Sequence, residues 1–154
     1  MLTADQMRTL PEFFLDIPDL RRKQGQRHSL PCILALATAA VLCGMEGYKA
    51  IGGWADDLGQ KARARFGCRK RNGRYHVPSR TTFRETLIGV DPEQLDLALQ
   101  GWNDQFAKED EGLAVDGKTM CNAIDEEGRQ THILGVVGHQ TGRCHTKKKS
   151  VLCL

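Results

Sequence analysis

A single carboxylate beside an apolar run is the residue of this chain best suited to do chemistry. Asp116 follows Leu113-Ala114-Val115 and precedes Gly117-Lys118-Thr119. An apolar run of this kind predicts a short buried strand, so we expect Asp116 to project from its end. In metal-dependent nucleases, two divalent ions about 3.5–4 Å apart act on the phosphodiester. Because one carboxylate cannot hold two ions, that chemistry requires further acidic ligands from elsewhere.

The same segment also matches a second motif. Gly112 to Thr119 fits the pattern G-x-x-x-x-G-K-T, the loop that cradles phosphates in nucleotide hydrolases. That loop follows a buried strand and opens a helix. Here an acidic stretch ending at Gly112 comes before the motif, and a short polar link to another strand is expected after it. We therefore favour a strand bearing Asp116 and keep nucleotide binding as an alternative.

The charged residues are strongly segregated along the chain. From Lys61 to Arg84 there are nine Lys or Arg and no acid, whereas Glu85 to Gly112 contains eight acids and one Lys. A basic block of this size predicts a phosphate-binding surface, and Gly67 to Tyr75 is expected to be a basic loop. The alternative is a solvated segment that balances the acidic helix. The candidate DNA contacts are Arg63, Arg65, Arg69, Lys70, Arg71, Arg74, Arg80 and Arg84.

The six cysteines lack close paired spacing, and no secretory segment opens the chain. We expect reduced thiols in a cytoplasmic protein, with Cys32 and Cys43 as small hydrophobes of an apolar helix. A zinc site is a weaker alternative, because its candidate ligands lack the tight pairing typical of such sites. These ligands are Cys121, His132, His139 and Cys144.

The core is expected to centre on one helix. Leu30 to Cys43 is apolar nearly all round, with Ser29 as candidate N-cap and Pro31 in the first turn, where proline is tolerated. The run ends at Gly44, short of the roughly 20 apolar residues that cross a bilayer. It therefore predicts a buried helix and no membrane segment.

A second helix is expected from Tyr48 to Leu58. Tyr48, Ile51, Ala55 and Leu58 fall on one face of it. Gly52 and Gly53 weaken this helix by roughly 1 kcal/mol each. We interpret them as residues that allow a neighbouring helix to approach closely.

Two further helices have clear starts. Ser79 or Thr82 is the expected N-cap of the first, with Phe83 and Leu87 facing inward and Arg80 and Arg84 outward, as in a DNA-recognition helix. A surface helix with two solvated arginines is the alternative. Asp91 caps the second, which begins at Pro92 and carries an apolar stripe for the core. That stripe consists of Leu95, Leu99, Trp102 and Phe106.

The pattern changes to strands beyond Gly112. Leu113 to Val115, His132 to Val137 and Arg143 to Lys149 predict an antiparallel meander, with turns at Asp125–Gly128 and Gln140–Gly142. The fold class is therefore α+β. The expected domains are a helical one over residues 1–111 and the start of another over 112–154.

Several motifs together resemble those of insertion-sequence transposases of the H-repeat-associated type, found with Rhs elements. The resemblance covers essentially the whole chain, and the order and spacing of the motifs are specific. The motifs that show the resemblance are Phe14-Leu15-Asp16-Ile17-Pro18-Asp19 with Arg21-Arg22, Gly25 and Arg27-His28 before Ile33-Leu34-Ala35-Leu36, Gly44 to Trp54, Val77-Pro78-Ser79 with Thr82-Phe83-Arg84, and Leu113 to Thr119 followed by His132-Ile133-Leu134.

The resemblance implies an RNase H-like catalytic domain with an Asp-Asp-Glu triad and Mg²⁺, and a helical N-terminal region that helps to bind DNA. It places the first catalytic, metal-binding carboxylate on Asp116. The family's second Asp and its Glu are expected beyond residue 154, and Asp125, Glu126 and Glu127 match no motif. Ser150 to Leu154 also departs from the family pattern.

The expectation is therefore a truncated transposase: a helical DNA-binding domain followed by the first antiparallel strands of an RNase H-like domain. Catalysis by this chain alone and stable binding of Mg²⁺ are not expected. The expected partners are DNA and a full-length transposase of the same type, with no membrane. The alternative function is a non-enzymatic DNA-binding module or repressor.

Overall fold

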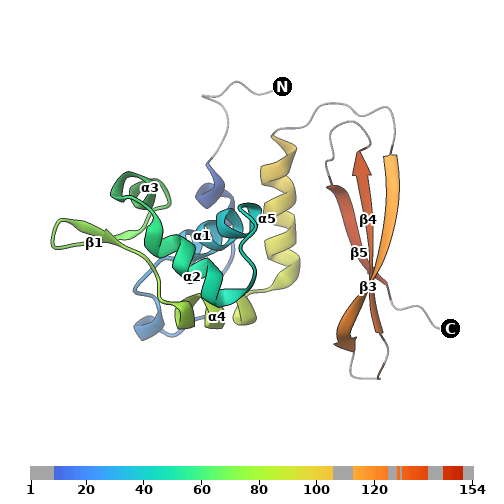
Figure 1. Ribbon diagram of the computed structural model, residues 1–154, viewed down its shortest axis with the longest axis horizontal. Helices are drawn as coiled ribbons and strands as arrows, with labels where there is room; N and C mark the ends of the chain where they lie inside the picture. Colours follow the sequence, from blue (N-terminus) through green and yellow to red (C-terminus); the bar gives the residue numbers. More distant parts are fainter. Residues whose placement is uncertain (1–8, 106–112, 125–127, 129, 139–143, 151–154) are drawn as a thin grey trace. The chain divides into compact units, whose positions relative to one another are not determined.

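The computed structural model describes residues 9–105, 113–124, 128, 130–138 and 144–150 of the 154-residue chain. These residues divide into a helical unit that ends at Trp102 and a second unit that begins at Asn103 and contains a three-stranded sheet (Figure 1). The mixture of helices with two small antiparallel sheets confirms the α+β class. The predicted domain boundary between residues 111 and 112 lies outside the described residues.

The helical unit is built from short elements. They are, in order, the 3₁₀ turns η1 (Leu10–Phe14) and η2 (Lys23–Gly25), helices α1 (Leu30–Leu42), α2 (Gly47–Asp57) and α3 (Gln60–Arg65), strands β1 (Arg69–Arg71) and β2 (Arg74–His76), and helices α4 (Arg80–Gly89) and α5 (Pro92–Asp104). The last two residues of α5 belong to the second unit.

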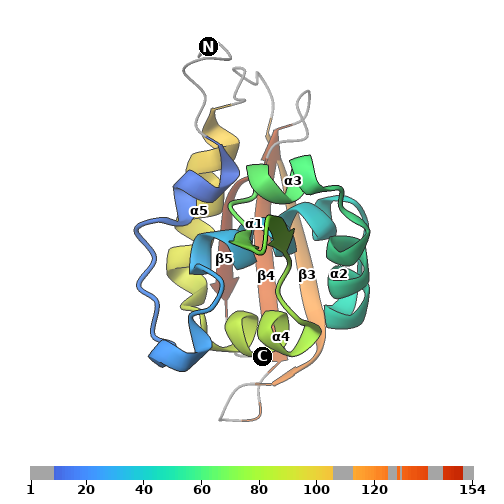
Figure 2. The same ribbon diagram turned by 90° about the vertical axis from the view of Figure 1, so that its left-hand side faces the viewer.

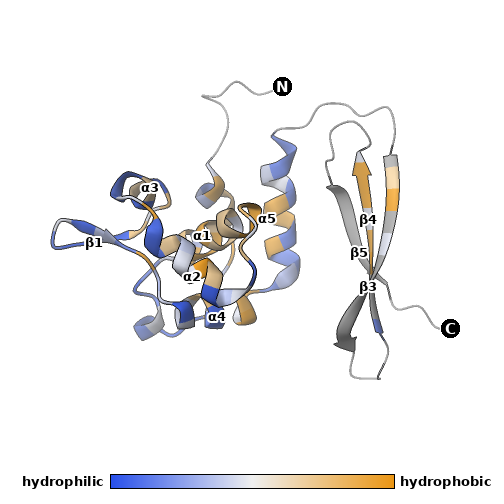
Figure 3. Cartoon of the chain, in the orientation of Figure 1, coloured by the Kyte–Doolittle hydropathy of each residue, from blue (hydrophilic) through white to orange (hydrophobic). Residues whose placement is uncertain are grey.

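Helix α1 forms the centre of this unit, as predicted. One side of α1 packs with Ile51 and Ala55 of α2 and Phe83 of α4, and another packs with Phe14 of η1 and Leu95 of α5. Figure 2 shows α1 between α2 and α5, and Figure 3 shows its hydrophobic colouring. A helix that is apolar all round requires such cover on several sides.

The glycines of α2 differ in their surroundings. A Cβ on Gly52 would lie 2.5 Å from Cγ of Arg80, whereas a Cβ on Gly53 would meet nothing within 4 Å. The predicted close approach of a neighbouring helix is thus confirmed for Gly52 alone. Of the residues predicted to share one face of α2, Ile51 and Ala55 are buried, whereas Tyr48 in the first turn is 38% exposed.

Side-chain caps fix the starts of α4 and α5. Ser79 Oγ accepts a hydrogen bond from the Thr82 amide at 3.2 Å, so Ser79 is the N-cap and Thr82 is not. Asp91 Oδ1 accepts from the Glu93 amide at 2.9 Å and from the Gln94 amide at 3.4 Å. Each cap satisfies amides that the first helical turn leaves without partners.

The second unit contains the predicted antiparallel meander, in the order β3-β4-β5. The strands run from Leu113 to Ile124, from Gln130 to Gly138 and from Cys144 to Ser150. β3 is therefore much longer than the predicted strand at 113–115. The predicted turns at 125–128 and 140–142 lie, apart from Gly128, outside the described residues.

Several short elements were not predicted. The 3₁₀ turns η1 and η2 and helix α3 were not recognised, and the expected basic loop at 67–75 contains most of the β1–β2 hairpin. The three cysteines whose side chains are described are free thiols; of these, Cys32 is buried as expected, but Cys43 ends α1 on its exposed side. None of the described helices is by itself long and apolar enough to cross a membrane, and α1 and α2 pass the same test together only with a 101° bend between them.

Candidate nucleic-acid interface

The β1–β2 hairpin is the most prominent feature of the basic segment. Arg71 lies opposite Arg74 in its antiparallel register, and the two residues between them, Asn72 and Gly73, have φ angles of 48° and 76°. Positive φ at both central positions is typical of a type I′ turn, for which Asn-Gly is a preferred sequence. The hairpin projects from the helical unit (Figure 1) and is hydrophilic in Figure 3.

One face of the hairpin carries only cationic or titratable side chains. Residues directly opposite each other in an antiparallel pair share a face, so Arg69 and His76 lie on the same face as Arg71 and Arg74. All four are exposed. Like charges placed opposite each other destabilise a hairpin, and a bound polyanion would remove this repulsion.

The hairpin is anchored to α3 through one strand residue. Gln60 Nε2 donates to the carbonyl of Tyr75 at 3.2 Å, and the Tyr75 amide donates to Gln60 Oε1 at 2.7 Å. Arg63 Nη1 donates to the same carbonyl at 3.2 Å. On the opposite strand, Lys70 Nζ lies 5.6 Å from the centre of the Tyr75 ring, within the range of a cation–π contact.

Arg63 makes two more hydrogen bonds to the backbone. Its Nε donates to the carbonyl of Leu58 at 2.8 Å and its Nη2 to the carbonyl of Asp56 at 2.7 Å. All three guanidinium nitrogens are thus used to join the end of α2 to β2. Among the predicted DNA contacts, Arg63 is the one whose donors are already engaged within the protein.

A buried thiol pair lies beneath the start of the hairpin. Cys32 Sγ of α1 donates a hydrogen bond to Cys68 Sγ at 3.7 Å, and both residues are buried. This hydrogen bond, together with burial, raises the pKa of the Cys32 thiol. The pair therefore links the residue before β1 to the core.

Helix α4 presents the two remaining arginines of the predicted set. Arg80 and Arg84 are one turn apart and both are exposed, while Phe83 between them is completely buried. The stem of Arg80 passes over Gly52 of α2, which fixes the direction of this side chain more firmly than a free surface position would.

The structure thus places the predicted residues on four consecutive elements. Seven of the eight are exposed and Arg63 is half-buried. The exposed ones are Arg65 of α3, Arg69, Lys70 and Arg71 of β1, Arg74 of β2, and Arg80 and Arg84 of α4.

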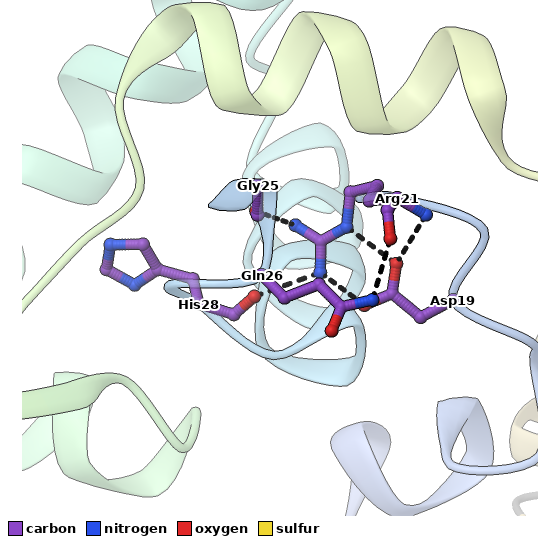
Figure 4. Close-up of polar contacts among 5 residues, drawn as sticks. All are labelled: Asp19, Arg21, Gly25, Gln26 and His28. Carbon is purple, nitrogen blue, oxygen red and sulfur yellow. Dashed lines mark hydrogen bonds and ion pairs between the residues drawn. The ribbon is translucent and has the colours of Figure 1, made fainter. Parts of the chain in front are cut away.

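A second arginine network supports the loop that precedes α1 (Figure 4). Arg21 binds Asp19 through two hydrogen bonds of 2.8 and 2.7 Å. It also donates to the carbonyls of Gly25 at 3.2 Å and His28 at 2.9 Å, and its own carbonyl accepts from Gln26 Nε2 at 2.8 Å. The Arg21 guanidinium lowers the pKa of Asp19. Sequence reasoning missed this network because its partners are mostly carbonyls.

His28 connects this loop electrostatically to the hairpin. Burial lowers the pKa of His28, and the positive charges of Arg69 and Arg21 and the nearby His76 lower it further. Its Nδ1 is buried without a hydrogen-bond partner among the described residues. His28 therefore remains neutral near pH 7 and adds no charge to the basic surface.

Asp116 lies inside β3 and not at a strand end, because the strand continues to Ile124. It is opposite Gly135 of β4, which is opposite Lys147 of β5. Within the described strand residues of this sheet, Asp116 is the only carboxylate. These residues therefore do not fit a site for two Mg²⁺ ions.

The two alternative sites of this unit are not assembled. His132 lies opposite Ser150, whereas Cys144 lies opposite Val137, five residues and about 16 Å away along β4. His132 and Cys144 therefore cannot bind one ion together, and the candidate ligand His139 lies outside the described residues. The G-x-x-x-x-G-K-T match fails as well, because Lys118 and Thr119 continue a strand where a phosphate loop opens a helix.

Comparisons with known proteins agree with this division of the chain. The model of the family described as DDE_Tnp_1-associated matches residues 11–103, which is nearly the whole helical unit. The chain belongs to this transposase-associated family. No solved structure matches it.

Two curated relatives extend over both units. The H repeat-associated putative transposase YhhI of Escherichia coli (strain K12) is 26% identical over 155 aligned residues, covering 94% of this chain and 39% of the relative. The uncharacterized protein in the dhlA 3′ region of Xanthobacter autotrophicus is 32% identical over 138 aligned residues, covering 79% and 41%. The chain spans about two fifths of the length of these relatives. Its relationship to insertion-sequence transposases of the H-repeat-associated type is therefore established.

Proposed function

We propose that the helical unit is the DNA-binding part of an insertion-sequence transposase. The observation that carries the proposal is the set of exposed Arg and Lys residues on α3, the β1–β2 hairpin and α4, in a segment, Lys61 to Arg84, that contains no acid. Phosphate neutralisation by Lys and Arg supplies most of the affinity in non-specific DNA binding. The similarity to an H repeat-associated putative transposase supports DNA as the polyanion.

The salt dependence of binding tests this proposal. If about five phosphates are contacted, log K falls against log[salt] with a slope of about −4.5. In the double variant Arg65→Gln/Arg69→Gln the slope should become less steep by about 1.8. The matched control is Arg22→Gln/Lys23→Gln, which removes the same charge from exposed residues outside the Lys61–Arg84 segment and should keep the original slope. A flat salt dependence of the unchanged chain would contradict the proposal.

For the second unit we propose that β3–β5 are the opening strands of an RNase H-like catalytic domain and that Asp116 is its first carboxylate. The antiparallel order β3-β4-β5 and the match of the Asp-Gly-Lys-Thr motif support this. Because the described strands supply one carboxylate, we propose that these 154 residues alone do not cleave DNA. Two-ion chemistry would need carboxylates supplied by additional chain.

Plasmid cleavage tests the second proposal. The chain incubated with supercoiled plasmid and Mg²⁺ or Mn²⁺ should nick no more DNA than Asp116→Ala does. Nicking by the unchanged chain that is lost in Asp116→Ala would refute it. Binding without cleavage would also suit the alternative function as a repressor that competes with a full-length transposase for the same DNA.

The free thiols of Cys32, Cys43 and Cys68 support a reducing, cytoplasmic setting.

A further inference from the structure

We infer that the β1–β2 hairpin enters the major groove of duplex DNA as a two-stranded ribbon, with Arg71 and Arg74 at its tip contacting base edges. The inference rests on the proposed function and adds to it a mode of binding. Its basis is the shape of the hairpin, the position of its side chains and its attachment to α3.

The dimensions of the hairpin match one groove better than the other. Each strand contributes three paired residues before the two-residue turn, so the ribbon extends about 10 Å at about 3.4 Å per residue. Its two backbones are about 4.8 Å apart, and side chains widen it further. The major groove is about 12 Å wide and 8.5 Å deep and admits a two-stranded ribbon, whereas the minor groove is about 6 Å wide.

The side chains at the tip have the chemistry to contact bases. Arg71 and Arg74 flank the turn and share a face, so they would reach deepest into a groove. A guanidinium can donate two parallel hydrogen bonds to O6 and N7 of guanine in the major groove. Arg69, on the same face near the base of the hairpin, would meet the phosphates at the groove's edge.

The attachment to α3 keeps the hairpin ready to bind. A two-stranded hairpin alone is marginally stable in water, and this one has opposed like charges. The hydrogen bonds of Gln60 and Arg63 to the backbone of Tyr75 and the type I′ turn hold it in shape. A ribbon that is already ordered loses less conformational entropy on binding.

Groove-blocking probes test the inference with the full 154-residue chain. One duplex carries glucosylated 5-hydroxymethylcytosine, which fills the major groove, and an otherwise identical duplex is saturated with netropsin in the minor groove. We expect glucosylation to weaken binding by about tenfold or more, within the range for losing base contacts in the major groove, and netropsin to leave it unchanged. The reverse result, equal sensitivity to both probes, or insensitivity to both would overturn groove entry while leaving DNA binding in place.

A variant without side-chain donors tests the role of the two arginines. Arg71→Met/Arg74→Met removes every donor of both side chains, whereas lysine could still donate to O6 and N7 of guanine. For the unchanged chain, replacing guanine by 7-deazaguanine should weaken binding by roughly five- to 150-fold per lost contact; the variant should lose this discrimination. Arg65→Met on α3 is the matched control and should retain it. Discrimination that survives in the double variant would refute base contact by these residues.

Two further outcomes separate this inference from the proposed function. Single-stranded DNA bound as tightly as duplex would contradict groove entry and leave nucleic-acid binding intact. Failure of the unchanged, folded chain to bind any duplex at low salt would refute the proposed function, and the inference with it. Circular dichroism of each variant verifies folding, which should be unaffected because the tip is exposed.

Discussion

Alanine substitution of the two adjacent glycines of α2 should have different effects on stability. Gly52 is buried against α4, and a Cβ there would lie 2.5 Å from Cγ, 3.5 Å from Cβ and 3.6 Å from Cα of Arg80. The distances to Cβ and Cα are ordinary van der Waals contacts, but Cγ would have to move. Because Cγ is close to the backbone, it can move only if the Arg80 side chain rotates about its Cα–Cβ bond or α4 shifts. Gly53, one residue later, has no atom within 4 Å of the same position.

The magnitudes follow from two competing effects. Alanine in place of glycine stabilises a helix interior by about 1 kcal/mol, and at Gly53 nothing opposes this. At Gly52 the extra methyl group overpacks the α2–α4 contact, which costs typically about 1–3 kcal/mol. Gly53→Ala should therefore be stabilised by about 1 kcal/mol, Gly52→Ala should be neutral or destabilised by up to about 2 kcal/mol, and the two variants should differ by about 1–3 kcal/mol.

Urea unfolding monitored by circular dichroism measures both free energies, and thermal melting should separate the variants by at least about 4 °C for a domain of this size. The difference between them isolates the steric term, because the propensity gain is common to both. If Gly52→Ala is as stable as Gly53→Ala, the close approach of Arg80 to α2 is wrong. A shift of α4 should also move Arg80, so we expect Gly52→Ala to bind DNA less tightly than Gly53→Ala does.

Four other substitutions test the local contacts of the helical unit. Ser79→Ala removes a side-chain cap and should destabilise the protein by about 1 kcal/mol, whereas Ser29→Ala should cost less because no cap hydrogen bond is made there; urea unfolding compares them. The pKa of Asp19 is lowered by Arg21 in the folded state, so its stabilising contribution is present above the usual value of 3.8 and is lost as the pH falls through the lowered pKa. Arg21→Met should therefore be less stable than the unchanged chain at pH 7, and the gap in unfolding free energy should shrink below pH 4; a gap independent of pH would refute this. Arg63→Lys loses the planar set of donors to three carbonyls, and we expect faster amide hydrogen exchange in the hairpin while the α1 core stays protected.

The helices that local chemistry specifies could be predicted from the sequence. Asp91 followed by proline and Ser79 before an apolar-periodic run are start signals that act within one turn, and both caps are confirmed. α3 lacks such a signal, because Gly59 precedes it without a side-chain oxygen and the helix has six residues. It is held by contacts with the hairpin, which sequence patterns do not contain.

The hairpin was missed for a related reason. Its strands consist of three residues each, dominated by arginine and lysine, and contain none of the β-branched residues that favour strands. The available signal was Asn72-Gly73, a preferred sequence for the type I′ turn of a two-residue hairpin loop. If this dipeptide had been given more weight than the charge of the segment, a hairpin would have been predicted in place of a loop.

Composition identified the basic surface but could not assign roles within it. Arg63 and Arg65 look equivalent in sequence, yet one donates to three backbone carbonyls and the other is exposed. The distinction depends on where Tyr75 and the end of α2 lie in space. Charge counting therefore predicts that a polyanion binds, and only the fold separates the residues that bind it from those that hold the surface together.

The same reasoning applies to Asp116, whose motif was recognised but whose setting was not. The described strands of its sheet contain no second acid. A site for two divalent ions needs further carboxylates beside Asp116. We therefore expect the DNA-binding function of this chain to be measurable without a catalytic one.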